Sequence, residues 1–231
     1  MFLAVKRLFS KIRKGQDKLM FEVENYLVKE LDNSEEIKEA QRLRCEIFFK
    51  TLHWDVKCSQ DGREYDRYDR YAAHFGIFDD KARLVAVSRI LTHDNPYGFM
   101  FQNEFRELVD EEKIKNIDLK RVAEISRLAI IPEKKEIKIR GHKLIEYLYK
   151  VMYKWSLTHQ KHFWIFCTYE RYIQNLRKNF PISFYFLGDK KRYQNDDFIQ
   201  IIMVDLKEAE RKVLYNFFKL QFFKLYNFFK K

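Results

Sequence analysis

Residues 123–131 read Ala-Glu-Ile-Ser-Arg-Leu-Ala-Ile-Ile, which predicts a buried strand that carries charged side chains among apolar ones. Glu124 and Arg127 are those charges, on either side of Ser126. About sixty positions earlier, residues 64–69 read Glu-Tyr-Asp-Arg-Tyr-Asp within a polar, irregular segment. Because a charge needs a partner when it is buried, these two stretches are candidates for a single polar site.

The apolar pattern on both sides of these stretches predicts an α/β protein with a mixed sheet. Polar and charged residues interrupt the apolar runs at intervals typical of short connections. The predicted strands cover residues 21–31, 72–78, 83–91, 123–131, 163–168, 183–187 and 198–205, and the predicted helices cover residues 33–52, 104–109, 141–159 and 171–179.

Length and charge limit the classes of protein to consider. A chain of 231 residues can bury a proper core, and we expect a domain at residues 21–206 between a basic amphipathic element at 1–20 and a Phe-rich amphipathic helix at 207–231. No apolar stretch approaches the roughly 20 residues that span a bilayer. The net charge of +11 indicates an acidic partner.

The C-terminal helix could lie in a membrane interface, pack on the domain or form a dimer contact.

The three cysteines are odd in number and contain no CxxC pair. Cys45, Cys58 and Cys167 therefore predict reduced thiols in a cytoplasmic protein, and neither a disulfide framework nor a zinc site. The histidines show no metal-ligand spacing with cysteines or acids, so we expect no metal.

Several of the residues above resemble, in order and spacing, the acyl-homoserine lactone (autoinducer) synthases and the related long-chain N-acyl amino acid synthases. Both are bacterial acyltransferases of the GCN5-related N-acetyltransferase (GNAT) superfold. The resemblance implies a GNAT-like, mostly antiparallel mixed sheet flanked by helices. It covers roughly residues 40–131 and rests on Arg44, Trp54, Glu64-x-Asp66-x-x-Asp69, Arg89 and Glu124-x-Ser126-Arg127.

The resemblance implies a catalytic set of Glu124, Arg127 and Asp66, with Glu124 as the base that deprotonates an amine directly or through water. The alternative is that Glu124 and Arg127 only pair across the sheet surface. An amino acid acceptor carries an ammonium and a carboxylate, so it requires a site with both signs. The alternative for this cluster is a structural ion-pair network that holds the loop closed. The implied acceptor-binding residues are Arg44, Trp54, Glu64, Asp69, Arg89 and Ser126.

The implied donor site is the segment at 138–143, before a predicted helix. In the superfold this loop binds a phosphopantetheine or pyrophosphate group through N–H groups at the helix start. Gly141 alone keeps the usual pattern, which puts coenzyme A binding in doubt. The added cations suit acyl carrier protein, which is strongly acidic; a solvated basic loop is the alternative. The implied contacts are Lys134, Lys135, Lys138, Arg140, Gly141, His142 and Lys143.

Three functions follow. The first is transfer of a fatty acyl group, expected to be long, from acyl carrier protein or coenzyme A to an amino acid. The second is an acyl-homoserine lactone synthase that uses S-adenosylmethionine, against which the sequence His-Asp-Asn-Pro-Tyr-Gly-Phe-Met at 93–100 departs from the usual threonine-rich turn. The third is a non-catalytic basic module that binds nucleic acid or membrane; the ordered acids argue against it, so we expect no nucleic acid partner. We expect a cytoplasmic protein that contacts the inner membrane peripherally.

Overall fold

The computed structural model describes residues 13–15, 18–180, 182–193 and 197–212. The chain divides into two compact units, of which the first is Met1–Tyr97 with Ile125–Gln160 and the second is Gly98–Glu124 with Lys161–Lys231. The strand β6 (Val122–Ile130) begins in the second unit and ends in the first. The predicted strand at 123–131 is thus confirmed, and it contributes residues to both units.

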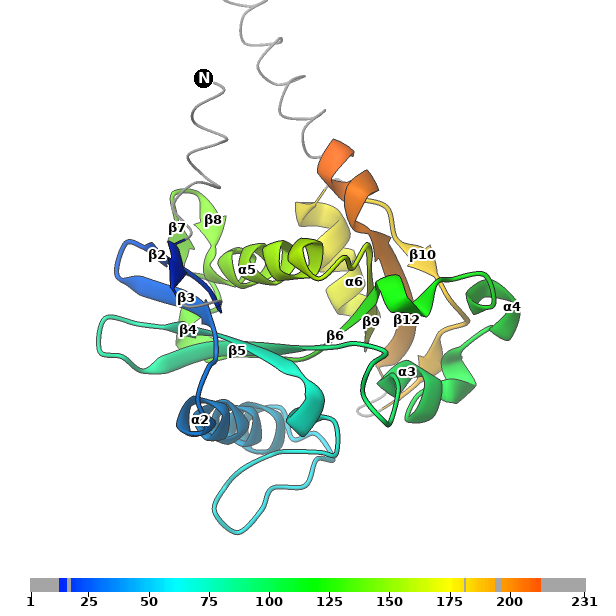
Figure 1. The fold of residues 1–231 in the computed structure, drawn as a ribbon. Helices are drawn as coiled ribbons and strands as arrows, with labels where there is room; N and C mark the ends of the chain where they lie inside the picture. Colours follow the sequence, from blue (N-terminus) through cyan, green and yellow to red (C-terminus); the bar gives the residue numbers. More distant parts are fainter. Residues whose placement is uncertain (1–12, 16–17, 181, 194–196, 213–231) are drawn as a thin grey trace, which may run out of the picture. The chain divides into compact units, whose positions relative to one another are not determined.

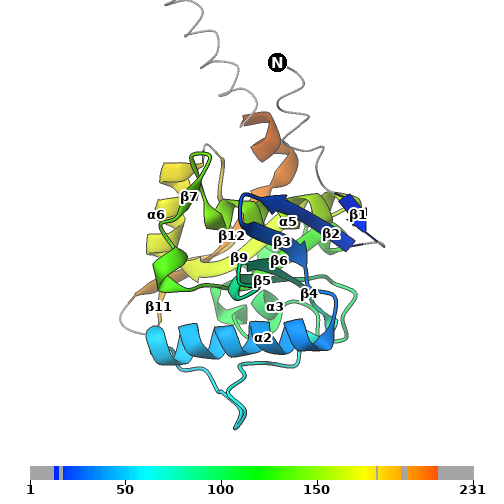
Figure 2. The ribbon, with the colours of Figure 1, turned by 90° about the vertical axis from the view of Figure 1, so that its left-hand side faces the viewer.

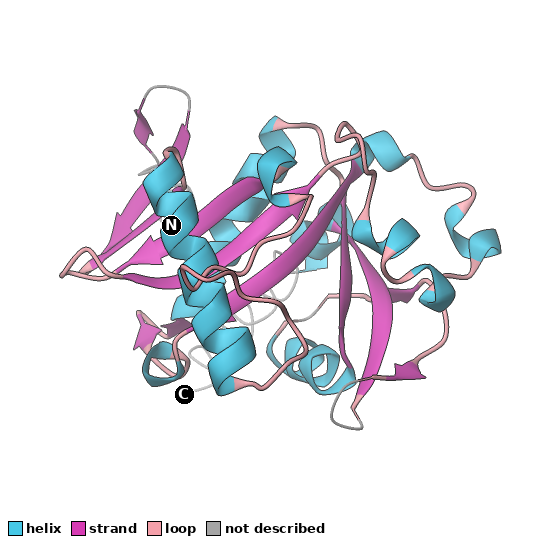
Figure 3. Ribbon diagram, turned by 90° about the horizontal axis from the view of Figure 1, so that it is seen from below, coloured by secondary structure: helices cyan, strands magenta, loops and turns pink. Residues whose placement is uncertain are grey.

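The first unit contains a sheet with the strand order β1-β2-β3-β4-β5-β6, in which the neighbours from β1 to β5 are antiparallel. Helix α5 lies over one face of this sheet and helix α2 lies over the other (Figure 1, Figure 2). Seen from below, α2 crosses the strands that it covers (Figure 3). The strands are β1 (Arg13–Gly15), β2 (Lys18–Val23), β3 (Tyr26–Glu30), β4 (Ala73–Phe78) and β5 (Leu84–Leu91), and the helices are α2 (Ser34–Arg44) and α5 (Leu144–Thr158).

The two helices explain why β5 is buried along its whole length. Its sequence is almost continuously apolar, as expected for a strand covered on both faces. On α5 the buried side chains recur at helical spacing and form one apolar stripe, which includes Leu144, Leu148, Val151 and Trp155. Arg89 is the one charged residue in β5, so its guanidinium must find partners inside the unit.

The second unit is built on β9 (Phe163–Tyr169) and β12 (Phe198–Asp205), which are antiparallel. The first residues of β6, Val122–Glu124, pair with β9 in parallel. Helix α6 (Glu170–Asn179) packs against β9 and β12. The remaining elements are short: α3 (Met100–Asn103), α4 (Glu111–Ile114), β10 (Tyr185–Phe186) and β11 (Lys191–Arg192).

Three predicted elements differ from the structure. The run at 21–31 is two strands, β2 and β3, because the chain turns at Glu24, whose φ is 48°. The predicted helix at 104–109 is only a 3-10 turn at Arg106–Leu108, after a short helix that begins at Met100. The predicted strand at 183–187 shortens to Tyr185–Phe186.

The terminal elements lie largely outside the described residues. Residues 13–15 and 18–20, assigned from sequence to the amphipathic N-terminal element, belong to strands β1 and β2. At the other end, the chain is helical from 206 to 212, where the C-terminal helix was expected to begin, and residues 213–231 are outside the described part. No helix within the described residues has the length and apolarity needed to cross a membrane.

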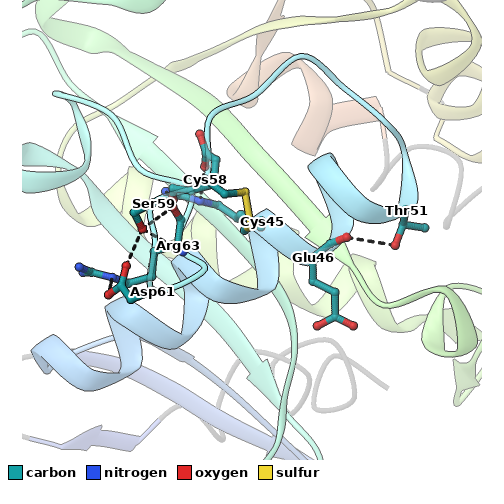
Figure 4. The surroundings of a disulfide bond; sticks show 9 residues. Cys45, Glu46, Thr51, Cys58, Ser59, Asp61 and Arg63 are labelled. Carbon is teal, nitrogen blue, oxygen red and sulfur yellow. Dashed lines mark hydrogen bonds and ion pairs between the residues drawn. A yellow bond between two sulfur atoms is a disulfide. The ribbon is translucent and has the colours of Figure 1, made fainter.

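The prediction that all three cysteines are reduced is wrong for two of them. Cys45 and Cys58 form a disulfide across 13 positions of sequence, while Cys167 is free. The chain leaves α2 through a π-helical segment, Cys45–Thr51, and the irregular loop then returns to the start of that segment (Figure 4). The cysteine content therefore no longer supports a cytoplasmic location, which stays a prediction.

Candidate active site

Arg44 is the first centre of a buried charge network in the first unit. It ends α2, and its guanidinium makes two hydrogen bonds to Asp69: NH1 donates to Oδ1 at 2.8 Å and NH2 donates to Oδ2 at 2.6 Å. The Nε atom is 2.8 Å from Oε2 of Glu64, and NH2 also donates to the Glu64 carbonyl oxygen at 2.5 Å. Arg44 therefore ties the helix to both ends of the predicted motif at 64–69.

Arg89 is the second centre, and its side chain has no exposed surface. Its NH1 donates to Oδ1 of Asp66 at 2.7 Å and its NH2 donates to Oδ2 of Asp66 at 2.7 Å. NH1 also donates to Oδ1 of Asp69 at 2.9 Å, and Nε donates to Oγ of Ser126 at 3.0 Å. The charge that the β5 pattern left without a partner is thus paired with two carboxylates.

Arg127, on β6, is the third arginine of the network. Its Nε donates to Oε1 of Glu64 at 3.0 Å, and its NH2 donates to Oδ2 of Asp66 at 2.9 Å. The backbone φ of Arg127 is 56°, a left-handed conformation that is unusual for a residue other than glycine inside a strand. Such conformations persist where the surroundings enforce them, and they are common at functional sites.

The network is electrically balanced. Each oxygen of its three carboxylates accepts a hydrogen bond from, or forms an ion pair with, an arginine. A buried set of charges needs this complete pairing to repay its loss of hydration. The structure brings together seven of the residues predicted for the acceptor site: Arg44, Glu64, Asp66, Asp69, Arg89, Ser126 and Arg127.

The arginines keep the two aspartates ionised. Burial alone would raise the pKa of Asp69, but the hydrogen bonds from Arg44 and the charges of Arg89 and Arg44 hold that pKa far below its ordinary value. Burial likewise opposes ionisation of Asp66, and hydrogen bonds from Arg89 together with the charges of Arg89 and Arg127 lower its pKa. Burial alone would lower the pKa of Arg89, but hydrogen bonds and charges from these two aspartates raise that pKa above its ordinary value.

His74 on β4 contacts the backbone of the network at Asp69. Its Nε2 is 2.9 Å from the backbone carbonyl of Asp69, and because a carbonyl oxygen only accepts, Nε2 carries the proton in this hydrogen bond. Burial lowers the pKa of His74, and the nearby charges of Arg44 and Arg89 lower it further, in spite of Asp69. His74 is therefore neutral near pH 7 and orients the loop that carries Asp69.

Local hydrogen bonds shape the loop at 64–71. Oδ2 of Asp69 accepts from the backbone N–H of Asp66 at 3.0 Å, and Oδ1 of Asp66 accepts from the N–H of Tyr68 at 2.9 Å. The bond from Tyr68 to Asp66 has the spacing of an Asx turn, and the bond from Asp66 to Asp69 closes the loop from the other direction. Tyr68 is buried beneath, with its ring 5.9 Å from the Arg89 guanidinium carbon. The loop is therefore built by the same carboxylates that bind the arginines.

Glu124 lies in the second unit, where it binds backbone groups. Its Oε2 accepts from the N–H of Met100 at 2.7 Å and its Oε1 accepts from the N–H of Phe101 at 3.0 Å, at the start of α3. Only 1% of the residue is exposed. Both oxygens thus hold the first turn of α3. The role of Glu124 as a base stays a prediction.

Trp54 lies against the end of the π-helical segment. Its ring stacks on Phe48 with centroids 4.9 Å apart, and its backbone N–H donates to the Phe48 carbonyl at 2.8 Å. Trp54 is partly exposed, whereas Phe48 is buried. The ring therefore covers the apolar base of the loop, and its contact with an acceptor stays a prediction.

The predicted donor loop is a short two-stranded ribbon. β7 (Lys138–Ile139) and β8 (His142–Lys143) pair around Arg140 and Gly141, both of which have positive φ. Positive φ at both central residues is the signature of the tight hairpin turn that favours glycine. The ribbon leads into α5, where Oε1 of Glu146 accepts from the N–H of Lys143 at 3.0 Å.

The charges of this ribbon are partly engaged. Nζ of Lys143 donates to Glu136 at 2.8 Å, and Nδ1 of His142 lies 2.9 Å from Oε2 of Glu146. Lys138 and Arg140 are exposed. The ribbon therefore presents cations at the surface, as expected for an anionic donor, although its backbone differs from the predicted loop. In the described part of the chain, no group of three or more His, Cys, Asp or Glu residues is placed to hold a metal ion.

Sequence reasoning missed three parts of this arrangement. The two N–H groups that bind Glu124 belong to Met100 and Phe101, whose apolar side chains give no sign of a polar role. The support from His74 was missed, although a histidine in an apolar strand could have indicated a buried polar partner. The pairing of Cys45 and Cys58 carries no signal in their spacing.

The fold is that of GNAT-like acyltransferases. The acyl-homoserine lactone synthase LasI matches with a TM-score of 0.62 at 18% identity, over 78% of this chain and 90% of LasI. BjaI, a coenzyme A-dependent acyl-homoserine lactone synthase solved with S-adenosylmethionine and isopentyl-CoA, matches with a TM-score of 0.63 at 19% identity, over 79% of this chain and 82% of BjaI. FeeM, an N-acyl amino acid synthase from uncultured soil microbes, matches with a TM-score of 0.58 at 13% identity, over 81% of this chain and 94% of FeeM.

The sequence profile of the autoinducer synthases matches residues 28–166, more than half of the chain. The chain therefore belongs to the autoinducer synthase family and is an acyltransferase. No curated protein matches it in a sequence search. The expected resemblance and the expected fold class are both confirmed.

Proposed function

We propose that this acyltransferase moves a fatty acyl group from a phosphopantetheine thioester to the amino group of an amino acid or a related small amine. The observation that carries this proposal is the contact between Asp66 and Arg127, whose charged groups lie 2.9 Å apart. Their side chains are 21% and 22% exposed, whereas those of Arg44, Asp69 and Arg89 are almost fully buried. One anion and one cation thus stand together at the accessible edge of the network.

This pair matches the two charges of an amino acid. The Asp66 carboxylate is held ionised, so it can accept hydrogen bonds from an ammonium group. A guanidinium binds a carboxylate in a fixed, forked geometry. The remainder of the network keeps both side chains in place, because each is bound to a further member: Asp66 to Arg89 and Arg127 to Glu64.

The reaction forms a C–N bond and breaks a C–S bond. The neutral amine attacks the thioester carbonyl carbon and forms a tetrahedral oxyanion with a protonated nitrogen. Collapse of this intermediate releases the thiolate, which takes up the proton that the nitrogen loses. An α-amino group has a pKa of about 8, so it needs only mild deprotonation before attack. The Asp66 carboxylate would bind the ammonium form, which gives one proton to water before the neutral amine attacks the thioester.

Acyl carrier protein is the proposed donor, because this protein has a net charge of +11 and exposed cations before α5. Surface charges of opposite sign accelerate protein association. Lys138 and Arg140 are the exposed cations of the ribbon and are proposed to contact the acidic partner. Coenzyme A thioesters carry the same phosphopantetheine group, and the experiment below compares the two donors.

S-Adenosylmethionine is the second candidate acceptor, which would make the protein an acyl-homoserine lactone synthase. The match to the autoinducer synthase family favours it, since the chain belongs to that family. S-Adenosylmethionine carries the same α-ammonium and carboxylate as an amino acid, so the Asp66–Arg127 pair fits both. The third candidate function is a non-catalytic basic module. The chain belongs to a family of acyltransferases, which argues against that function.

The experiment is a matrix of donors and acceptors. Purified protein is incubated with acyl carrier proteins of several acyl chain lengths, or the matching coenzyme A thioesters, together with either a pool of amino acids or S-adenosylmethionine. Mass spectrometry then identifies the products. The proposal predicts an N-acyl amino acid and faster turnover of acyl carrier protein than of coenzyme A. An acyl-homoserine lactone as the only product would select the second candidate.

Matched variants connect the product to the site. Asp66→Asn and Arg127→Gln remove one charge each from the exposed edge of the network. Asp118→Asn and Arg121→Gln remove the same charges from an exposed ion pair elsewhere. The first pair should lose most of the activity and the second pair should retain it. Equal activity in all four variants, or no acylated product with any combination, would contradict the proposal.

A further inference from the structure

The disulfide stands beside the charge network and joins the segments that carry two of its members. Cys45 follows Arg44 directly in the chain, and Cys58 forms a backbone bridge with Glu64. The side chains of Arg44 and Glu64 are ion-paired at 2.8 Å. The covalent bond and the ion pair therefore connect the same two segments, the end of α2 and the start of the motif at 64–69.

Most of residues 49–57, between the two cysteines, are exposed. Within this segment, the ring of Trp54 stacks on Phe48. Directly after Cys58 the chain makes a turn in which the N–H of Ser59 donates to the Arg63 carbonyl at 2.8 Å. Oγ of Ser59 donates to Asp61 at 2.5 Å, next to the disulfide (Figure 4). Further along, Glu64 binds α2 independently of the disulfide: its N–H donates to the Gln41 carbonyl at 3.0 Å, and Arg44 binds both its carbonyl oxygen and its carboxylate. A covalent tie has the largest effect where few other contacts order the chain.

The two cysteine residues differ in exposure. Cys45 is 3% exposed, whereas Cys58 is partly exposed in the loop. A thiolate from solvent therefore reaches Sγ of Cys58 first. Its attack forms a mixed disulfide with Cys58 and releases Cys45 as a thiolate. A second thiol of the same reductant then displaces Cys58, so that a dithiol is oxidised while the protein gains two thiols.

We infer that the Cys45–Cys58 pair is a thiol-sensitive clamp that orders the acceptor side of the site. In the oxidised protein the clamp holds residues 46–64 on α2 and keeps Glu64 in position to bind Arg127. Reduction by a dithiol loosens this segment, and Arg127 loses the fixed partner that aligns its guanidinium with Asp66. Glutathione disulfide reverses the change by oxidising the two thiols to the disulfide with release of two glutathione thiols.

The effect on the acceptor rests on the proposed function, whereas the effect on the loop does not. Hydrogen exchange therefore tests the clamp directly, with full-length protein oxidised by glutathione disulfide or reduced by dithiothreitol. Amides at 46–64 should exchange roughly tenfold faster or more after reduction, which corresponds to about 1.4 kcal/mol of lost local stability. Amides in β9 and β12 should not change. Cys167→Ser should respond in the same way as the unmodified chain.

The double variant Cys45→Ser/Cys58→Ser should exchange at the reduced rate in both conditions. Unchanged exchange at 46–64 on reduction, or three alkylated thiols after treatment with glutathione disulfide, would overturn the clamp. For an amino acid that gives product, reduction should raise KM several-fold with a smaller change in kcat. Faster exchange without a change in KM would show that the clamp does not affect binding of the acceptor. If no acceptor gives product, the proposed function fails, and the exchange result still decides the clamp.

Discussion

The guanidinium of Arg89 makes two parallel hydrogen bonds to Asp66, each of 2.7 Å, although the arginine has no exposed surface. The strand that carries Arg89 is otherwise apolar apart from Ser88, so nothing else in it can compensate the charge. The bond is therefore required for burial, and it also fixes the carboxylate that we propose to bind the acceptor. Stability and acceptor binding depend on the same contact.

Arg89→Ala should destabilise the protein strongly. The substitution leaves the buried Asp69 and the partly buried Asp66 without their shared partner, and breaking a buried ion pair from one side costs about 3–5 kcal/mol. Unfolding in urea measures the loss. Arg121→Ala, at an exposed pair with Asp118, should cost less than about 1 kcal/mol. Similar losses in the two variants would show that the Arg89 network adds little to stability.

Glu124→Gln separates a structural role from a catalytic one. Both oxygens of Glu124 accept from backbone N–H groups, and a glutamine amide can replace only one of them. We expect a loss of about 1–3 kcal/mol in the free energy of unfolding, because one buried N–H is left without an acceptor. Glu107→Gln on the surface of the same unit should have no effect. A loss of turnover without a loss of stability would instead identify Glu124 as the base.

The folded protein should lose stability as the pH falls below about 6.5, in part because of His74. Burial lowers the pKa of His74, so the unfolded chain binds more protons than the folded one between the lowered value and the ordinary value of about 6.5. The contribution of His74 is thus complete above pH 6.5 and is lost as the pH falls towards the lowered value. Urea unfolding at pH 5.5 and pH 7.5 measures this difference.

His74→Gln is the matched variant, because an amide can still donate to the Asp69 carbonyl while it cannot be protonated. Its stability should fall less between pH 7.5 and pH 5.5 than that of the unmodified protein. An identical pH dependence in the two proteins would mean that His74 is not held neutral by the fold.

Loss of the disulfide should reduce global stability as well as local order. Cys45 and Cys58 close a loop of 13 positions, and a bond across such a loop typically contributes about 2–4 kcal/mol by restricting the unfolded chain. Chemical denaturation of Cys58→Ser, compared with Cys167→Ser, measures the difference. Equal stability of these two variants would show that the bond contributes nothing to folding.

Much of the fold follows from local sequence. The hairpin of β4 and β5, the strand β6 and the helix α5 have apolar periods that are long enough to read without tertiary information. The turn at Glu24 could not be read, because a charged residue between apolar ones also fits one continuous alternating strand. Short elements such as β10 depend on pairing with β12, which no local pattern encodes.

The sequence indicated most members of the charge network but not the contacts among them, and their role in binding an acceptor stays a prediction. The resemblance supplied the arginines and acids that the structure places in one network, and it placed Glu124 with them as a base. The backbone N–H groups of Met100 and Phe101 could not be predicted as its partners, since every residue other than proline carries such a group. The disulfide could not be predicted either, because it forms only when the loop after Cys45 brings Cys58 back to the end of α2.

The most direct test of the account compares acceptors that differ only in the carboxylate. The amino acid that turns over fastest and its carboxamide are each measured with the unmodified protein and with Arg127→Gln. If Arg127 binds the acceptor carboxylate, the unmodified protein should prefer the amino acid by roughly tenfold or more in kcat/KM, and Arg127→Gln should lose that preference. An equal preference in the two proteins would contradict the proposal that the Asp66–Arg127 pair recognises the acceptor.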